Sequence, residues 1–98
     1  MNDFDKIIND TKPTLVDFFA TWCGPCRLQG PILEDVKKKF GDTVNIIKID
    51  VDKNPELSAR YSVRSIPTLI VFKAGEALWR GYGLHQADQI EAKLNEHL

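Results

Sequence analysis

Two cysteines separated by only two residues, Cys23 and Cys26, are the side chains of this 98-residue chain best suited to chemistry. They lie in the segment Trp22-Cys23-Gly24-Pro25-Cys26, where an apolar run gives way to a helical pattern. At the start of a helix, residues three apart lie on one side of the turn, within the ~4.4 to 6.8 Å between Cα atoms that a disulfide requires. The pair can therefore join and separate without unfolding the chain.

The two sulfurs differ in their position relative to the predicted helix. Cys23 faces the unpaired N–H groups and the positive end of the helix dipole, which favour a thiolate over a thiol. Gly24 allows a tight turn beside that sulfur, and Pro25 is tolerated because amides of the first turn have no helical partner. Cys26 lies one turn deeper and lacks most of this stabilisation. We expect Cys23 to be the nucleophile and Cys26 the resolving thiol.

Three other interpretations of the cysteine pair remain open at this point. A structural disulfide would close a loop of only four residues, which is worth on the order of 2 kcal/mol, less than a longer loop gives. A zinc site needs four ligands, and the only histidines, His85 and His97, have eleven residues between them, which matches no common zinc finger. Two inert buried thiols would leave Gly24 and Pro25 without a purpose. We therefore favour a redox pair and predict no metal.

Composition limits the classes of partner and the cellular location. The chain is 43% hydrophobic and 28% charged, with a formal net charge of −1. A chain of this length can bury roughly two thirds of its unfolded surface, so we expect a single domain over residues 1–98. The pI of about 6.1 disfavours nucleic acid or an acidic membrane as a partner, because both favour a basic face.

The sequence also predicts a cytoplasmic protein. No apolar run approaches the ~20 residues of a membrane span, and the polar start Met1–Lys6 lacks the apolar core of a signal peptide. The cytosol is a reducing compartment, where a permanent disulfide is disfavoured. This location strengthens the interpretation of the cysteines as a reactive pair.

Three elements are predicted in the first half of the chain. Asp3–Asp10 has apolar residues at helical spacing behind an acidic start. Thr14–Ala20 is apolar on both faces apart from one aspartate, which is typical of a central strand covered on each side. From Cys23 to Phe40 the apolar residues follow a helical stripe that ends at Gly41, and Pro31 is expected to kink this helix.

The second half predicts three strands and two helices. Val44–Asp50 has apolar side chains pointing both ways and should lie beside the first strand. The pair Asn54-Pro55 is a helix cap followed by a first-turn proline, and it should open a short helix. Pro67–Phe72 and Ala77–Tyr82 are predicted strands, and Ala87–Leu98 carries the apolar stripe of a closing helix.

The order of these elements predicts the fold class. Strands that alternate with helices imply parallel pairing. The two late strands are joined at Ala74-Gly75, which is too short for anything but an antiparallel hairpin. We therefore predict an α/β fold with a central, mixed sheet of about four strands and helices on both faces.

Several segments of the chain resemble one known family. The stretch Val16–Cys26 strongly resembles the active-site segment of the thioredoxin family. Ile66-Pro67-Thr68 and Phe72–Glu76 are similar to further thioredoxin segments, in the order and at the spacing of that family. The resemblance covers nearly the whole chain, and Trp-Cys-Gly-Pro-Cys followed by Ile-Pro-Thr is a far more specific signal than a lone C-x-x-C. It implies the thioredoxin-like fold.

The resemblance also implies an activity, namely the reduction of protein disulfides by dithiol exchange through Cys23 and Cys26. The Cys23 thiolate would attack a partner disulfide, and Cys26 would then release the reduced partner and leave a Cys23–Cys26 disulfide. An NADPH-dependent flavoprotein, thioredoxin reductase, would restore the dithiol, and the chain itself would bind no cofactor. The alternative is a thioredoxin-like scaffold or binding module in which the dithiol is incidental.

Two charged residues match family positions behind the cysteines. Asp17 is a carboxylate in an otherwise apolar central strand, so desolvation should raise its pKa and allow proton exchange with Cys26 near neutrality. Lys48, in the predicted neighbouring strand, matches the family's lysine that moderates this carboxylate. The alternative is a solvent-facing lysine beside an edge aspartate.

Four further residues match the surface where thioredoxins dock their partners. Pro67 matches a proline that the family holds in cis, which would expose the backbone of Ile66 for strand-like pairing with a substrate. Trp22, Ile66 and Gly83 match positions of a flat apolar docking surface. The alternatives are an ordinary strand-opening proline at Pro67, core packing at Trp22 and a plain turn glycine at Gly83.

The sequence departs from the family pattern in three places. Thioredoxins usually have an additional strand before the first helix, so we expect Val44–Asp50 to form a bare sheet edge that could pair with another chain in a dimer. Phe19 replaces a tryptophan that is common two residues after the buried aspartate. Trp79, on a late strand, has no family role.

Overall fold

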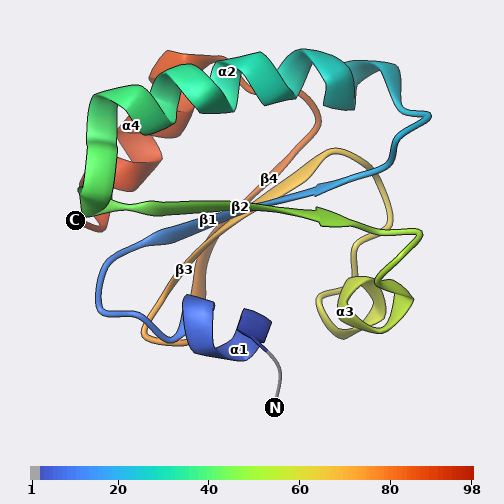
Figure 1. The fold of residues 1–98 in the computed structure, drawn as a ribbon, viewed down its shortest axis with the longest axis horizontal. Coiled ribbons are helices and arrows are strands. Elements are labelled where there is room, and N and C mark those ends of the chain that lie inside the picture. Colours follow the sequence, from blue (N-terminus) through green and yellow to red (C-terminus); the bar gives the residue numbers. More distant parts are fainter. Residues whose placement is uncertain (1–2) are drawn as a thin grey trace.

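The computed structural model describes residues 3–98, which form four strands, four α-helices and one short 3-10 helix. Figure 1 labels the α-helices and strands and colours the ribbon along the sequence, from blue at the N-terminus to red at the C-terminus. They are α1 (Asp3–Ile8), β1 (Thr14–Phe19), α2 (Gly24–Phe40), η1 (Gly41–Thr43), β2 (Asn45–Asp50), α3 (Pro55–Arg60), β3 (Thr68–Lys73), β4 (Glu76–Tyr82) and α4 (Ala87–Glu96). Every predicted helix and strand is present, with ends that differ by a few residues.

The strands form one mixed sheet in the order β2-β1-β3-β4. Strands β1 and β2 are parallel, and both β1–β3 and β3–β4 are antiparallel. Helices α2 and α4 cover one face of the sheet, and α1 and α3 cover the other (Figure 1). This arrangement confirms the predicted fold class. Within residues 3–98, β2 is one edge of the sheet, as expected from the sequence.

Alternation along the central strand builds a core on each face. Leu15 of β1 packs with residues of α2 and α4, whereas Val16 and Phe18 pack with residues of α1 and α3. Asp17 and Phe19 therefore share the α2 side of the sheet with Leu15, because side chains alternate along a strand. A strand buried on both faces explains the nearly continuous apolar run from Thr14 to Phe19.

Helix α2 carries the cysteine pair. Pro25 lies in its first turn, and the helix continues through Pro31 to Phe40. It stops at Gly41, whose φ of +57° is in the left-handed region that glycine adopts readily. One face of the helix is buried against the sheet and α4, formed by Cys26, Gln29, Leu33 and Val36.

The predicted capping role of Asn54 at the start of α3 was wrong. Asn54 stands at the N-cap position of α3, but its side chain makes no capping hydrogen bond. The Asn54 amide instead donates to the backbone oxygen of Asp50 at 3.0 Å, which ties the helix start back to the end of β2. Asparagine is suited to this, because its short side chain readily bonds to nearby backbone.

Candidate functional site

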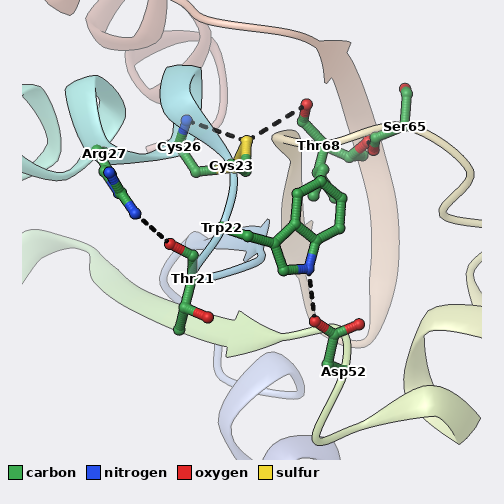
Figure 2. The surroundings of a disulfide bond; sticks show 9 residues. Thr21, Trp22, Cys23, Cys26, Arg27, Asp52, Ser65 and Thr68 are labelled. Atoms are coloured by element: carbon green, nitrogen blue, oxygen red, sulfur yellow. Dashed lines mark hydrogen bonds between the residues drawn. A yellow bond between two sulfur atoms is a disulfide. The ribbon is translucent and has the colours of Figure 1, made fainter.

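The two cysteines lie at the N-terminus of α2, after the short loop that follows β1, where they are joined in a disulfide (Figure 2). Their Cα atoms are 5.3 Å apart, inside the range that a disulfide allows. Cys23 is the N-cap residue of α2, and its Sγ accepts a hydrogen bond of 3.2 Å from the backbone N–H of Cys26. The helix therefore directs an otherwise unpaired amide at the first sulfur.

The electrostatic setting distinguishes the two sulfurs. No acidic residue occupies the first turn of α2, so nothing there opposes the positive end of the helix dipole at Cys23. Cys26 is inside the helix, on its buried face. Both cysteines are largely covered, with 5% of Cys23 and 3% of Cys26 exposed, so a partner sulfur must reach them along a defined path.

Two side chains flank the pair and are fixed by hydrogen bonds. Figure 2 shows the indole of Trp22 directed toward Asp52, to which Nε1–H donates at 2.9 Å. Trp22 is nevertheless 68% exposed, and core packing is thereby excluded for it. The Arg27 guanidinium donates to the backbone oxygen of Thr21 at 3.1 Å, which closes the loop between β1 and α2.

The loop after α3 reaches the disulfide, and the loop after β4 is bonded to that loop. The Ile66–Pro67 peptide bond is cis, and the Ile66 carbonyl oxygen lies 3.9 Å from Cys23 Sγ. The Pro67 oxygen accepts a 2.8 Å hydrogen bond from the N–H of Gly83, whose φ is +78°. The structure thus places Ile66 beside Cys23, with Pro67 next to it in the chain and Gly83 bonded to Pro67, although all three are far from Cys23 in sequence.

Asp17 is fully buried on the α2 side of the sheet. Neither of its carboxylate oxygens has a hydrogen-bond partner among residues 3–98. Burial raises the pKa of Asp17 from 3.8 to about 6, and the charge of Lys48 acts in the opposite direction. The carboxyl can therefore gain or lose a proton close to neutral pH.

Lys48 lies between two parts of the site: it is the β2 neighbour of Asp17, and it lines the same hollows as Cys26. It pairs with Asp17 in the register of β1 and β2, and it is solvent-exposed. Its Nζ lies 4.6 Å above the centre of the Phe19 ring, a cation–π arrangement. Two adjoining hollows, of about 480 and 190 Å³, are both lined by Lys48, Arg27 and Cys26. Solvent can therefore approach Cys26 beside the Lys48 ammonium.

Gln29 and His85 also belong to the site, and the sequence interpretation had not included them. Gln29 is fully buried in α2, one turn after Cys26, and its amide bonds to the backbone of His85. The sequence signal that could have identified Gln29 is its polar side chain on the apolar face of a helix. Its partner lies 56 residues away, so the pair could not be assigned from spacing.

The described part of the chain offers neither a metal cluster nor a membrane helix. Within residues 3–98, no three histidine, cysteine, aspartate or glutamate side chains gather as metal ligands. No helix in the same residues is long and apolar enough to cross a membrane.

Comparison with known proteins gives a consistent result. The Thioredoxin family model matches residues 1–96. The chain is 43% identical over 96 residues to a thioredoxin from Alicyclobacillus acidocaldarius, covering 98% of this chain and 91% of the relative. It is 44% identical over 97 residues to a thioredoxin from Staphylococcus epidermidis, covering 99% and 92%. The solved structure of Fasciola hepatica thioredoxin superposes with a TM-score of 0.89 at 37% identity, covering 98% of this chain and 92% of that one.

Proposed function

This chain belongs to the thioredoxin family, and from that premise we propose how its residues carry out exchange and how it is recycled. It is a thiol–disulfide oxidoreductase that reduces protein disulfides through its Cys23–Cys26 pair. The observation that carries the proposal is the placement of Cys23 Sγ at the N-cap of α2, beside an amide donor and next to its partner sulfur.

In the first step, the Cys23 thiolate attacks one sulfur of a partner disulfide. A bond forms between Cys23 and that sulfur, and the other partner sulfur leaves as a thiolate and takes up a proton. The N–H groups at the start of α2 stabilise Cys23 as a thiolate before the attack. We propose that Trp22, Ile66, the cis Pro67 and Gly83 form the docking surface for the partner; the exposure of Trp22 and the position of the Ile66 oxygen near Cys23 support this.

In the second step, Cys26 resolves the mixed disulfide. The Cys26 thiol gives its proton to Asp17, and its sulfur attacks Cys23 Sγ and expels the second partner sulfur as a thiolate. The two electrons that reduce the partner thus come from the dithiol, which becomes the Cys23–Cys26 disulfide. The unpartnered Asp17 carboxylate, with its pKa raised to about 6, suits this acceptor role. Lys48 moderates the charge of Asp17.

The cycle needs an external reductant. We infer that an NADPH-dependent reductase, of the thioredoxin reductase class, returns the pair to the dithiol, and that disulfide-containing proteins are the clients. We further propose a single domain over residues 1–98 acting in the cytoplasm, where the dithiol would remain reduced. The Gly24-Pro25 pair between the cysteines favours the reducing direction. A reduction potential well above that of the cytosolic glutathione pool would contradict this direction.

The function is tested by insulin reduction with dithiothreitol as the electron source. We expect the wild-type protein to accelerate precipitation of reduced insulin and Cys23→Ser to lose the acceleration, because no nucleophile remains. Lys38→Ala, an exposed change on the outer side of α2, is the matched control and should retain the activity. If Cys23→Ser is as active as wild type, the chain is a scaffold whose dithiol is incidental.

The resolving role of Cys26 is tested by trapping. Cys26→Ser should accumulate covalent complexes with client proteins, because the mixed disulfide forms and is not released. These complexes should be dissolved by reductant on a gel and be absent when Cys23 is also replaced by serine. Recovery of no reducible complexes from a lysate would count against the assignment of Cys26.

A further inference from the structure

Gln29 uses both atoms of its side-chain amide to hold one residue of a distant loop. Its Nε2–H donates to the backbone oxygen of His85 at 3.0 Å, and its Oε1 accepts from the backbone N–H of His85 at 2.9 Å. Gln29 is fully buried, so loss of this contact would leave polar groups without partners. The contact joins the active-site helix α2 to the segment between β4 and α4.

The His85 side chain fixes the same segment from within. Its Nδ1 lies 2.9 Å from the carbonyl oxygen of Gly83, and its ring meets the Trp79 ring edge-on, with centres 5.4 Å apart. Both rings lie over Gly81. A Cβ at that position would come within 2.8 Å of the His85 ring and closer still to Trp79, so only glycine leaves room for them. This packing gives Trp79 a place in the architecture.

The segment held in this way is bonded to the loop that lies beside the reactive sulfur. The N–H of Gly83 donates to the Pro67 oxygen, and the neighbouring Ile66 oxygen lies 3.9 Å from Cys23 Sγ. These contacts link Gln29 of α2 to His85, His85 to Gly83, and Gly83 to Pro67. The neighbouring Ile66 lies beside Cys23 at the N-terminus of the same helix. On either side of Gly83, Tyr82 and Leu84 present exposed apolar side chains.

We propose that Gln29 and His85, which we term the Gln29–His85 clamp, position the Gly83 segment relative to Cys23 and thereby determine how well the protein engages protein disulfides. The inference rests on the proposed function, because it assumes that partners dock at Ile66, Pro67 and Gly83. A protein substrate must contact this surface and Cys23 at once, so it depends on their relative placement. A small disulfide needs only the sulfur. Gln29 and His85 are positioning residues that act through Gly83.

The test compares a protein disulfide with a small one. Fully reduced protein is mixed with insulin or with hydroxyethyl disulfide, and its oxidation is followed by acid quench and mass spectrometry. For Gln29→Met, which keeps the side-chain length and removes both hydrogen bonds, we expect the rate constant with insulin to fall about tenfold. The rate constant with hydroxyethyl disulfide should stay within about twofold of wild type, because the α2 N-terminus is unchanged.

Three further variants separate positioning from general loss of stability. Val36→Ala removes a buried side chain elsewhere in α2 and should leave the ratio of the two rate constants unchanged. His85→Ala loses the hydrogen bond to Gly83 and should lower the ratio. His85→Asn can still reach the Gly83 oxygen and should restore the ratio toward the wild-type value. This pair decides the question if Gln29→Met does not fold.

The clamp is refuted if the ratio of the insulin rate constant to the hydroxyethyl disulfide rate constant is the same in Gln29→Met as in wild type. It is also refuted if both rate constants fall together, since a parallel fall would place the effect on the cysteines. The clamp is likewise refuted if His85→Ala and His85→Asn both have the wild-type ratio, or if both have an equally low ratio. Failure of the proposed function is distinguishable, because the reduced wild-type protein would then react with both disulfides no faster than the urea-unfolded chain does.

Discussion

Replacement of Asp17 by asparagine should stabilise the folded protein at neutral pH. Asp17 is fully buried, and neither carboxylate oxygen has a hydrogen-bond partner within residues 3–98. The exposed Lys48 ammonium compensates its charge only partly, so desolvation dominates and the pKa rises. An asparagine side chain has nearly the same shape as an aspartate and carries no charge. The comparison therefore isolates the free-energy cost of burying the ionised carboxylate.

The magnitude follows from linkage between protonation and folding. A rise in the Asp17 pKa from 3.8 to about 6 on folding corresponds to about 3 kcal/mol. Because the folded pKa is the higher one, the native state binds more protons than the unfolded state between these two values. The contribution of Asp17 to stability therefore falls as pH rises from about 4 to about 6 and stays low above that.

Urea unfolding of the oxidised wild-type and Asp17→Asn proteins across this pH range measures the effect. At neutral pH we expect the variant to be more stable by up to about 3 kcal/mol, and below about pH 4 we expect the two free energies of unfolding to converge. Asp35→Asn, an exposed change on α2, should remain within about 0.5 kcal/mol of wild type. A destabilised Asp17→Asn protein, or a difference that does not vary with pH, would refute the reasoning.

Three other results are expected from the same geometry. Lys48→Met should raise the pKa of Asp17 further, because the Lys48 charge opposes the effect of burial; nuclear magnetic resonance titration of the Asp17 carboxyl measures it, and a lower pKa would contradict it. Resolution of a mixed disulfide by Cys26 should speed up as pH rises through the Asp17 titration, whereas Asp17→Asn should lack that rise. Stopped-flow measurement of the partner release rate tests this, and identical pH profiles of that rate in the two proteins would remove Asp17 from the proton transfer. Trp22→Ala should slow insulin reduction about tenfold and change stability by less than about 0.5 kcal/mol, because Trp22 is exposed and is proposed to dock partners. Leu78→Ala, another exposed apolar residue, serves as its control, and equal rates in the two variants would argue against docking at Trp22.

Much of the fold was predictable because local pattern and tertiary environment agree. Thr14–Phe19 is apolar on both faces because it is a central strand, and the same pattern identified Asp17 as a carboxylate in an apolar strand. The helical stripe after Cys23 and the short link at Ala74-Gly75 likewise indicated α2 and the β3–β4 hairpin. In these segments the local sequence pattern is enough to indicate which side chains are buried.

The remaining features depend on contacts between distant residues. Spacing shows that Gln29 is a polar residue on an apolar helical face, but it does not show that its amide meets His85 across 56 residues. The position of Lys48 over the Phe19 ring likewise follows from the pairing of β1 with β2. The Asn54 side chain makes no capping bond, because it is turned toward the end of β2, where its Nδ2 donates to the backbone oxygen of Asp50.

The most direct test of the account is the alkylation rate of each sulfur in the reduced protein. Iodoacetamide labelling at neutral pH, resolved by peptide mass spectrometry, reports Cys23 and Cys26 separately. Cys23 should react at least about tenfold faster than Cys26 and faster than either cysteine in the urea-unfolded chain, because the Cys26 N–H at the start of α2 faces its sulfur and a helix N-terminus favours a thiolate. Equal and slow labelling of both cysteines would contradict the account.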